Sequence, residues 1–289
     1  MKFWQVVSFS EPDQLPGIAR AAEEAGFHGV LVSDHLFFPG RLASRYPYSP
    51  DGKPGFDGQT PFPAPWVTIA AMAAVTERLR FATMVYVLPL RHPVEVAKTV
   101  GTASVLSGGR VALGVGAGWI REEFDALGVD FATRGRCMDE CIEVLRRCWS
   151  GEMIDHQGVF FDLPPLQMSP APAAPIPIWV GGLSPAALRR AAQLGDGWIG
   201  TGQGPEELLP ILERLTALRG EAGREREPFE VMAPLTVPPE PELLRRLGER
   251  GVTSTTAWPF SYTIGPRTSL AQKRDAMRRF GDEVIARVS

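Results

Sequence analysis

Apolar and polar positions alternate in blocks along almost the whole chain. Short apolar runs predict buried strands, and the longer stretches between them, in which apolar residues recur every three or four positions, predict amphipathic helices. The predicted strands cover residues 3–8, 29–33, 79–85, 110–115, 176–180, 197–200, 229–236 and 252–258. The predicted helices cover residues 13–25, 65–76, 93–106, 136–149, 185–193, 205–218, 239–250 and 269–285.

Eight strand–helix units follow one another in 289 residues. Strands that alternate with helices indicate a parallel sheet with right-handed crossovers. This number of units at this length favours an α/β fold of the (β/α)8 TIM barrel type over the alternative, a doubly wound open sheet with an inserted lobe. Because no charged or Ser/Gly-rich linker divides the chain, we expect one domain over residues 1–289.

Two irregular stretches interrupt the alternation, residues 36–63 and residues 151–175. The second contains a segment that could form a hairpin followed by an extended crossing. Long loops within compact domains are often functional, and the active site of a barrel is built from the loops at the C-terminal ends of its strands. We therefore expect both stretches to lie at that face and to determine the substrate.

Composition narrows the class of protein. The formal net charge is −3 and no long basic run is present, which argues against a nucleic-acid partner. No apolar stretch approaches the roughly 20 residues that cross a bilayer, and the N-terminus lacks a signal-peptide pattern, so we expect no membrane span and a cytoplasmic location. Cys137, Cys141 and Cys148 share one face of a predicted helix. We interpret them as reduced core cysteines and predict no metal site, because no second Cys or His cluster accompanies them.

The second predicted strand ends in three polar residues, Ser33, Asp34 and His35. A catalytic triad, a metal site, the wall of a cofactor pocket and a simple strand cap are all compatible with an adjacent acid and imidazole. The sequence contains no Gly-x-Ser-x-Gly nucleophile turn, which disfavours a hydrolase triad. The chain has four histidines, and the other three show no ligand spacing with His35, which disfavours a metal site.

Two loops late in the chain have the composition of a phosphate site. Residues 180–185 read Val-Gly-Gly-Leu-Ser-Pro, where a predicted strand ends in two glycines and a helix begins with Pro at its first turn. The next strand ends in Gly200-Thr201-Gly202. Glycine lets backbone N–H groups approach an anion, and a helix N-terminus favours negative charge. Each loop alone is compatible with an ordinary turn, but together they predict a phosphorylated ligand.

Small residues also follow the fourth strand, where residues 114–118 read Gly-Val-Gly-Ala-Gly. This is not a dinucleotide fingerprint, because the glycines are too closely spaced and do not open a first βα unit. The small side chains would leave room for a flat ring at the mouth of the barrel. Trp119, Trp198 and Trp258 lie at strand ends and are candidates to line a pocket, although each position is equally compatible with the core.

Three stretches carry a resemblance to a known family: "AAEEAGFHGVLVSDH", "RLRFATMVYVLPLRHPVEVAKTVGTASVLSGGRVALGVGAGWIREEFDALGVDFATRGRCMDE" and "IWVGGLSPAALRRAAQLGDGWIG". Over nearly its whole length the chain resembles the bacterial-luciferase-like flavin and deazaflavin oxidoreductases. Through its "YPYSPDG" and "PIWVGGLSPAALRRAA" segments it is most similar to a small actinobacterial group predicted to use coenzyme F420.

The resemblance implies a (β/α)8 barrel that holds a flavin or deazaflavin ring at the C-terminal ends of its strands, and by analogy a homodimer. It places Asp34 and His35 beside the reactive centre and a non-prolyl cis peptide behind the ring at Met84-Val85. It further implies that the ring and its phosphate are bound by Gly116, Ala117, Val180, Gly181, Gly182 and Thr201. Two features depart from relatives: Ala64 replaces an acidic residue before Pro65, and the last third lacks a basic cluster, which argues against a sugar phosphate as substrate.

Three functions are compatible with this sequence. The first is an F420-dependent oxidoreductase that moves hydride between the deazaflavin and a small organic substrate, with His35 as proton donor or acceptor and Asp34 orienting it. The second is an FMN-dependent luciferase-like monooxygenase that uses reduced FMN and O2. The third is a non-catalytic barrel that binds a flavin or deazaflavin. In each, residues 36–38, Leu-Phe-Phe, are expected to begin the loop that covers the site.

Overall fold

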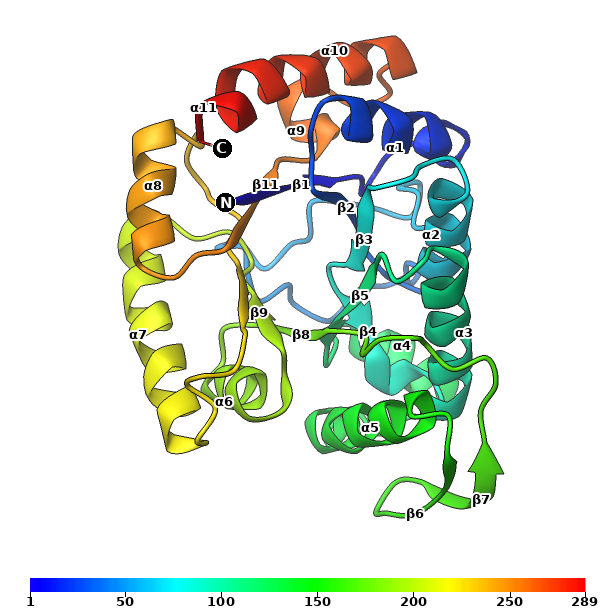
Figure 1. The fold of residues 1–289 in the computed structure, drawn as a ribbon. Coiled ribbons are helices and arrows are strands. Elements are labelled where there is room, and N and C mark those ends of the chain that lie inside the picture. The colour runs from blue at the N-terminus through cyan, green and yellow to red at the C-terminus, as the bar shows by residue number, and fades with distance from the viewer. Residues whose placement is uncertain (289) are drawn as a thin grey trace.

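The computed structural model describes residues 1–288 and shows a closed barrel of eight parallel strands (Figure 1). The strands are β1 (Lys2–Val6), β2 (Gly29–Val32), β3 (Arg80–Thr83), β5 (Val111–Gly116), β8 (Ile178–Gly181), β9 (Gly197–Ile199), β10 (Glu230–Met232) and β11 (Ser254–Ala257). The barrel closes because β1 pairs with both β2 and β11, and β3 pairs with β5. The short β4 (Tyr86–Val87) follows β3 and continues its pairing with β5. The (β/α)8 prediction is confirmed, and the doubly wound alternative is wrong.

Helices surround the barrel as an outer ring in Figure 1. They are α1 (Leu15–Glu24), α2 (Pro65–Ala73), α3 (Pro93–Leu106), α5 (Arg134–Trp149), α6 (Pro185–Leu194), α7 (Pro205–Glu221), α8 (Pro241–Glu249) and α10 (Leu270–Phe280). Proline, whose fixed φ suits the first turn of a helix, opens α2, α3, α6, α7 and α8. The described helices include none that is both long and apolar enough to cross a membrane.

Short elements decorate this frame. Single 3-10 turns cover Pro12–Gln14 and Leu88–Leu90, a π-helical turn covers Gly281–Ile285, and the remaining helices are α4 (Arg121–Leu127), α9 (Phe260–Thr263) and α11 (Ala286–Val288). The strands β6 (Met153–Gln157) and β7 (Asp162–Gln167) form an antiparallel hairpin outside the ring, as the sequence indicated for this stretch (Figure 1). The expectation that residues 151–175 lie at the C-terminal face and determine the substrate is wrong. The stretch connects the end of α5 to the start of β8, which places it at the N-terminal ends of the strands, and none of its residues lines the cavity described below. Sequence periodicity did not predict α4, which has only seven residues and ends at Gly128 in the left-handed conformation (φ 67°).

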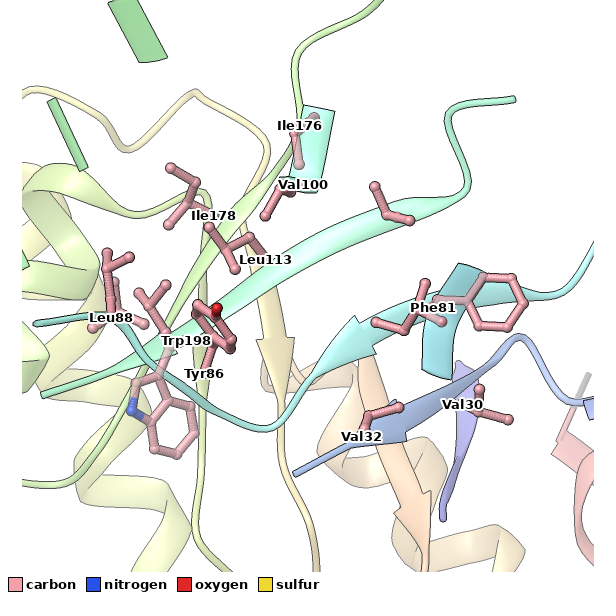
Figure 2. Packing of buried hydrophobic residues seen from close by; sticks show 14 of the residues in the cluster. Val30, Val32, Phe81, Tyr86, Leu88, Val100, Leu113, Ile176, Ile178 and Trp198 are labelled. Atoms are coloured by element: carbon pink, nitrogen blue, oxygen red, sulfur yellow. The ribbon is translucent and has the colours of Figure 1, made fainter. Parts of the chain in front are cut away.

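Alternate residues along each barrel strand face two different apolar layers. Trp4, Leu31, Ala82, Ala112, Trp179, Ile199 and Met232 fill the inside of the barrel. Their strand neighbours pack outward against the helices, and Figure 2 shows Leu113 of β5 and Ile178 of β8, which are register partners, beside Val100 of α3. This alternation decides which strand-end residues reach the mouth of the barrel.

The three cysteines lie on α5 and are free and buried within the outer layer, as the helical spacing predicted. Among residues 1–288, no group of three or more His, Cys, Asp or Glu side chains is arranged to hold a metal ion.

His28 makes the fold sensitive to acid. Its ring meets Trp4 edge-on at a centroid distance of 5.1 Å. Burial, aided by the charges of Lys2 and Arg80, lowers the pKa of His28 from 6.5 to about 4. His28 therefore binds a proton more weakly in the folded protein than in the unfolded chain, and the free energy of unfolding decreases as pH falls from about 6.5 toward 4.

We expect His28→Gln to reduce this decrease, measured by urea titration as the difference in unfolding free energy between pH 7.5 and pH 4.5. An equal loss in both proteins would contradict the assignment.

Candidate active site

A cavity of about 820 Å³ opens at the C-terminal ends of the strands, within the range of about 300–1,000 Å³ that is typical of small-molecule sites. This is the face where barrel enzymes carry their chemistry. Of the ten site residues that the sequence suggested, the cavity lining includes nine: Asp34, His35, Met84, Val85, Gly116, Ala117, Gly181, Gly182 and Thr201. These residues come from five different strand ends, so the fold brings them together from across the sequence.

The tenth, Val180, does not reach the cavity. Its side chain is fully buried in the outer layer against the helices. The physical reason is the alternation along β8: Trp179 faces the barrel interior, so Val180 must face away from it. Trp198 is also fully buried, but its indole N–H donates to the carbonyl of Gly182 at 2.9 Å and so supports the glycine loop. Of the three candidate tryptophans, only Trp119 lines the cavity.

The floor of the cavity is built around Val85. The peptide bond between Met84 and Val85 is cis, at the position that the family resemblance implied. A Cβ placed on Gly116 would lie 2.5 Å from one Val85 methyl carbon, and a Cβ on Gly181 would lie 2.8 Å from the other. Val85 therefore fills the space that larger side chains would occupy on β5 and β8. The hydroxyl of Ser33 donates to the carbonyl of Met84 at 3.1 Å and ties this floor to the end of β2.

Asp34 is held by Arg91. The guanidinium makes a bidentate contact, with Nη1 to Oδ2 at 2.5 Å and Nη2 to Oδ1 at 2.8 Å, and the Val87 backbone N–H donates to Oδ2 at 2.9 Å. Burial acts to lower the pKa of Arg91, but the charge of Asp34 and the hydrogen bonds to it outweigh burial and raise that pKa. Asp34 is buried and both of its carboxylate oxygens accept hydrogen bonds, so Asp34 and Arg91 together form a fixed part of the cavity wall.

Asp34 does not orient His35, contrary to the role suggested from the sequence. Successive side chains along extended backbone point to opposite sides, so neighbours in sequence are poorly placed to bond each other. The partner of His35 is Glu123 of α4, whose Oε2 lies 3.1 Å from Nδ1. The other oxygen of Glu123 accepts the Leu36 backbone N–H at 2.6 Å, and the Glu123 side chain is fully buried.

The carboxylate of Glu123 determines the tautomer of His35. An ionised carboxylate only accepts hydrogen bonds, so Nδ1 must carry the proton that is shared with it. Nε2 is then left without a hydrogen-bond partner among residues 1–288, on a side chain that lines the cavity. His35 is thereby arranged to accept or donate a proton at Nε2.

Glu122, the neighbour of Glu123, holds the next part of the long loop. It accepts the backbone N–H groups of Ala43 and Ser44 and the Ser44 hydroxyl. Burial acts to raise its pKa, but these hydrogen bonds outweigh burial and lower the pKa of Glu122 to about 2. The loop does cover the cavity as expected, but through residues 45–62. Leu36 and Phe37, expected to begin the cover, are 44% and 40% exposed and do not line it.

The opposite end of the cavity is formed by the glycine loops. Ser184 caps α6, and its hydroxyl accepts the Ala187 N–H at 3.2 Å. Gly182 has φ of +120°, a conformation that favours glycine. The Thr201 hydroxyl accepts a hydrogen bond from Gln203 at 2.8 Å and keeps its own proton for a ligand. This end has the backbone and hydroxyl donors that a phosphate requires.

Sequence reasoning missed several lining or supporting residues: Arg91, Glu123, Arg134, Arg190, Tyr46, Tyr48, Phe56 and Phe62. Arg134 and Arg190 both line the cavity on the side of the glycine loops. Arg190, on α6, is paired with Asp139 and also donates to the Gly135 carbonyl at 3.0 Å, so of these two only Arg134 adds uncompensated positive charge there. The pairs His35–Glu123 and Asp34–Arg91 are separated by 88 and 57 residues. The sequence does show two adjacent acids, Glu122 and Glu123, shortly after Trp119. A single sequence does not show which residues these acids contact in the folded protein.

Comparisons with known proteins bear on the family and the fold. A family model described as luciferase-like monooxygenase matches residues 5–242. An uncharacterized protein of Mycobacterium tuberculosis is 42% identical over 277 residues, which cover 94% of each chain. An F420-dependent glucose-6-phosphate dehydrogenase of Microbacterium testaceum is 31% identical over 283 residues, which cover 94% of this chain and 76% of the relative.

A solved structure, an F420-dependent secondary alcohol dehydrogenase in complex with an F420-acetone adduct, has a TM-score of 0.77. It is 17% identical, and the match covers 100% of this chain and 99% of that one, so it supports the fold. The barrel, its cavity and the length of the family match lead to one conclusion: the chain belongs to the luciferase-like monooxygenase family.

Proposed function

We propose that this protein is an F420-dependent oxidoreductase that transfers hydride between the deazaflavin and a small organic substrate. The observation that carries the proposal is the cavity floor at Val85, where Gly116 and Gly181 contribute no side chains, bordered by the Asp34–Arg91 pair and by a histidine whose Nε2 has no partner among residues 1–288. The F420-dependent relative at 31% identity supports the choice of cofactor. By analogy with the family we also propose a homodimer.

The residues present fit such a cofactor. Gly116 and Gly181 leave no side chain above Val85, so a planar ring can lie against the floor. The Gly181-Gly182 loop, the cap of α6 and the Thr201 hydroxyl would hold the phosphate. Arg134, which donates to the carbonyls of Gly118 and Phe131 and has no carboxylate partner among residues 1–288, adds charge to that end.

When bound, the deazaflavin would supply hydride chemistry, and the chain's residues would orient the reactants and exclude water. Nε2 of His35 would hold or receive the proton that accompanies hydride transfer, and Glu123 would stabilise the imidazolium. Asp34 would keep the backbone of Val87 in place beside the floor. The aromatic residues of loop 36–63 would close the cavity from above.

Titration with both cofactors tests the proposal. We expect the purified protein to quench F420 fluorescence with saturable binding and to retain F420 through gel filtration, while FMN binds at least about tenfold more weakly, a difference of about 1.4 kcal/mol. Tighter binding of FMN would favour the reduced-FMN monooxygenase. If the protein binds F420 but turns over none of the substrates tried, the non-catalytic barrel would be favoured.

A substitution in the floor tests the ring site. In Gly116→Ala the new methyl group would meet Val85 at 2.5 Å and push it into the cavity. We expect the dissociation constant for F420 to rise at least about tenfold, measured by fluorescence quenching. Gly220→Ala is the control, because a Cβ there meets nothing within 4 Å. Unchanged affinity in a folded Gly116→Ala protein would show that the ring lies elsewhere.

Substitutions at His35 and Glu123 test the proton-transfer role. We expect His35→Ala to remove turnover and Glu123→Gln to lower kcat at least about tenfold, with F420 affinity within about threefold in both. The reason is that glutamine cannot accept from His35 and Leu36 with both of its terminal atoms. Asp125→Asn, an exposed change on the same helix, is the control. Normal kcat in Glu123→Gln would remove Glu123 from this role.

A further inference from the structure

We propose that the part of the cavity beside His35 binds an uncharged, largely apolar, ring-bearing substrate rather than a sugar phosphate. This inference rests on the proposed function, because it assigns the substrate half of the same cavity. Its basis is a group of five rings that we call the aromatic cage, all of which line the cavity: Phe9, Phe56, Phe62, Trp119 and Tyr262.

The aromatic cage surrounds the catalytic imidazole. The centroid of the His35 ring lies 5.1 Å from that of Phe56, 5.2 Å from Phe62 and 5.8 Å from Trp119. Phe9 extends the wall, at 5.7 Å from Phe62 and 6.2 Å from Tyr262. Most of these contacts are edge-to-face, the arrangement that aromatic rings prefer. A substrate held within reach of His35 therefore meets ring faces and edges on several sides.

The backbone at Phe9 is consistent with a ring placed there for a ligand. Phe9 has φ of +65°, and among the non-glycine residues of the described chain only Arg267 shares a positive φ. The left-handed conformation is unfavourable for a residue with a Cβ, because the Cβ approaches the following carbonyl oxygen too closely. Such conformations persist where the surrounding structure enforces them, and they cluster at functional sites. Phe9 follows β1 and brings into the cage a ring that the loop 36–63 does not supply.

The charges near His35 are already engaged. Asp34 is neutralised by Arg91, and Glu123 is bonded to His35 and Leu36. Arg45 also lines the cavity and has no carboxylate partner among residues 1–288, but it is exposed and its guanidinium donates to the Asp51 carbonyl within its own loop, so its charge stays in contact with solvent. Because burial of an unpaired charge is costly, an anionic group on the substrate would be disfavoured inside the cage.

Two tyrosines separate the cage from the phosphate end without adding charge. Tyr46 lies 5.1 Å from Trp119 and 5.4 Å from Tyr48, and the Tyr48 hydroxyl lies 3.6 Å from the Cβ position of Gly182. Burial raises the pKa of Tyr46 to about 12, so it remains a neutral hydrogen-bond donor. The cavity thus divides into a phosphate end, to which Arg134 contributes a charge without a carboxylate partner among residues 1–288, and an aromatic end around His35.

Binding of two probes tests this division. We expect calorimetry on the full chain, with and without F420, to show saturable binding of 2-naphthol and at least about tenfold weaker binding of glucose 6-phosphate. Phe56→Ala and Phe56→Leu should each weaken 2-naphthol binding by about threefold to tenfold, the loss expected for an aromatic contact, without changing F420 affinity. Phe37→Ala, an exposed change in the same loop, should leave both affinities within about twofold.

Three results would overturn the assignment of the aromatic cage: glucose 6-phosphate binding as tightly as 2-naphthol, unchanged 2-naphthol affinity in both Phe56 variants, or competition between 2-naphthol and F420. The F420 titration tests the proposed cofactor independently of the aromatic cage. Binding of 2-naphthol that depends on Phe56 in a protein that does not bind F420 would support the cage while refuting the proposed cofactor.

Discussion

The site depends on one buried carboxylate. Glu123 is fully shielded from solvent, and its two oxygens are shared between the imidazole of His35 and the backbone N–H of Leu36. An ionised side chain without partners would be strongly disfavoured at such a position, so the carboxylate requires both donors to stay in place. The same interaction therefore sets the tautomer of His35, the proposed proton carrier, and anchors the start of the loop that covers the cavity.

This anchoring links three parts of the molecule. The strand β5 ends beside the cavity, α4 follows it with Glu122 and Glu123, and these acids hold loop 36–63 at two points. From those points the loop carries its aromatic residues over the cavity. At the far side, the glycine loop after β8 and the cap of α6 form a separate polar end. The long loop thus covers the proposed substrate end of the cavity, while the strand ends and the start of α6 form the proposed cofactor end.

The sequence predicted the barrel because the features involved are local. Strand and helix periods and prolines at helix starts act over a few residues, so they predicted the elements of the barrel. The ten proposed site residues came largely from the family resemblance, and nine of them line the cavity. The prediction that Val180 lines the cavity is wrong, because its neighbour Trp179 faces the inside of the barrel and Val180 therefore faces the helices. The partners of Asp34 and His35 could not be predicted, since Arg91 and Glu123 become their neighbours only when the barrel closes.

The tautomer of His35 tests the central claim most directly. Nitrogen-15 NMR of the four histidine rings, with His35 assigned through its absence in His35→Asn, reports which ring nitrogen carries the proton. For the neutral ring, we predict a proton on Nδ1 and none on Nε2 in the native protein, and a mixture of the two tautomers in Glu123→Gln. A proton on Nε2 in the native protein, or identical spectra in the two proteins, would contradict the account.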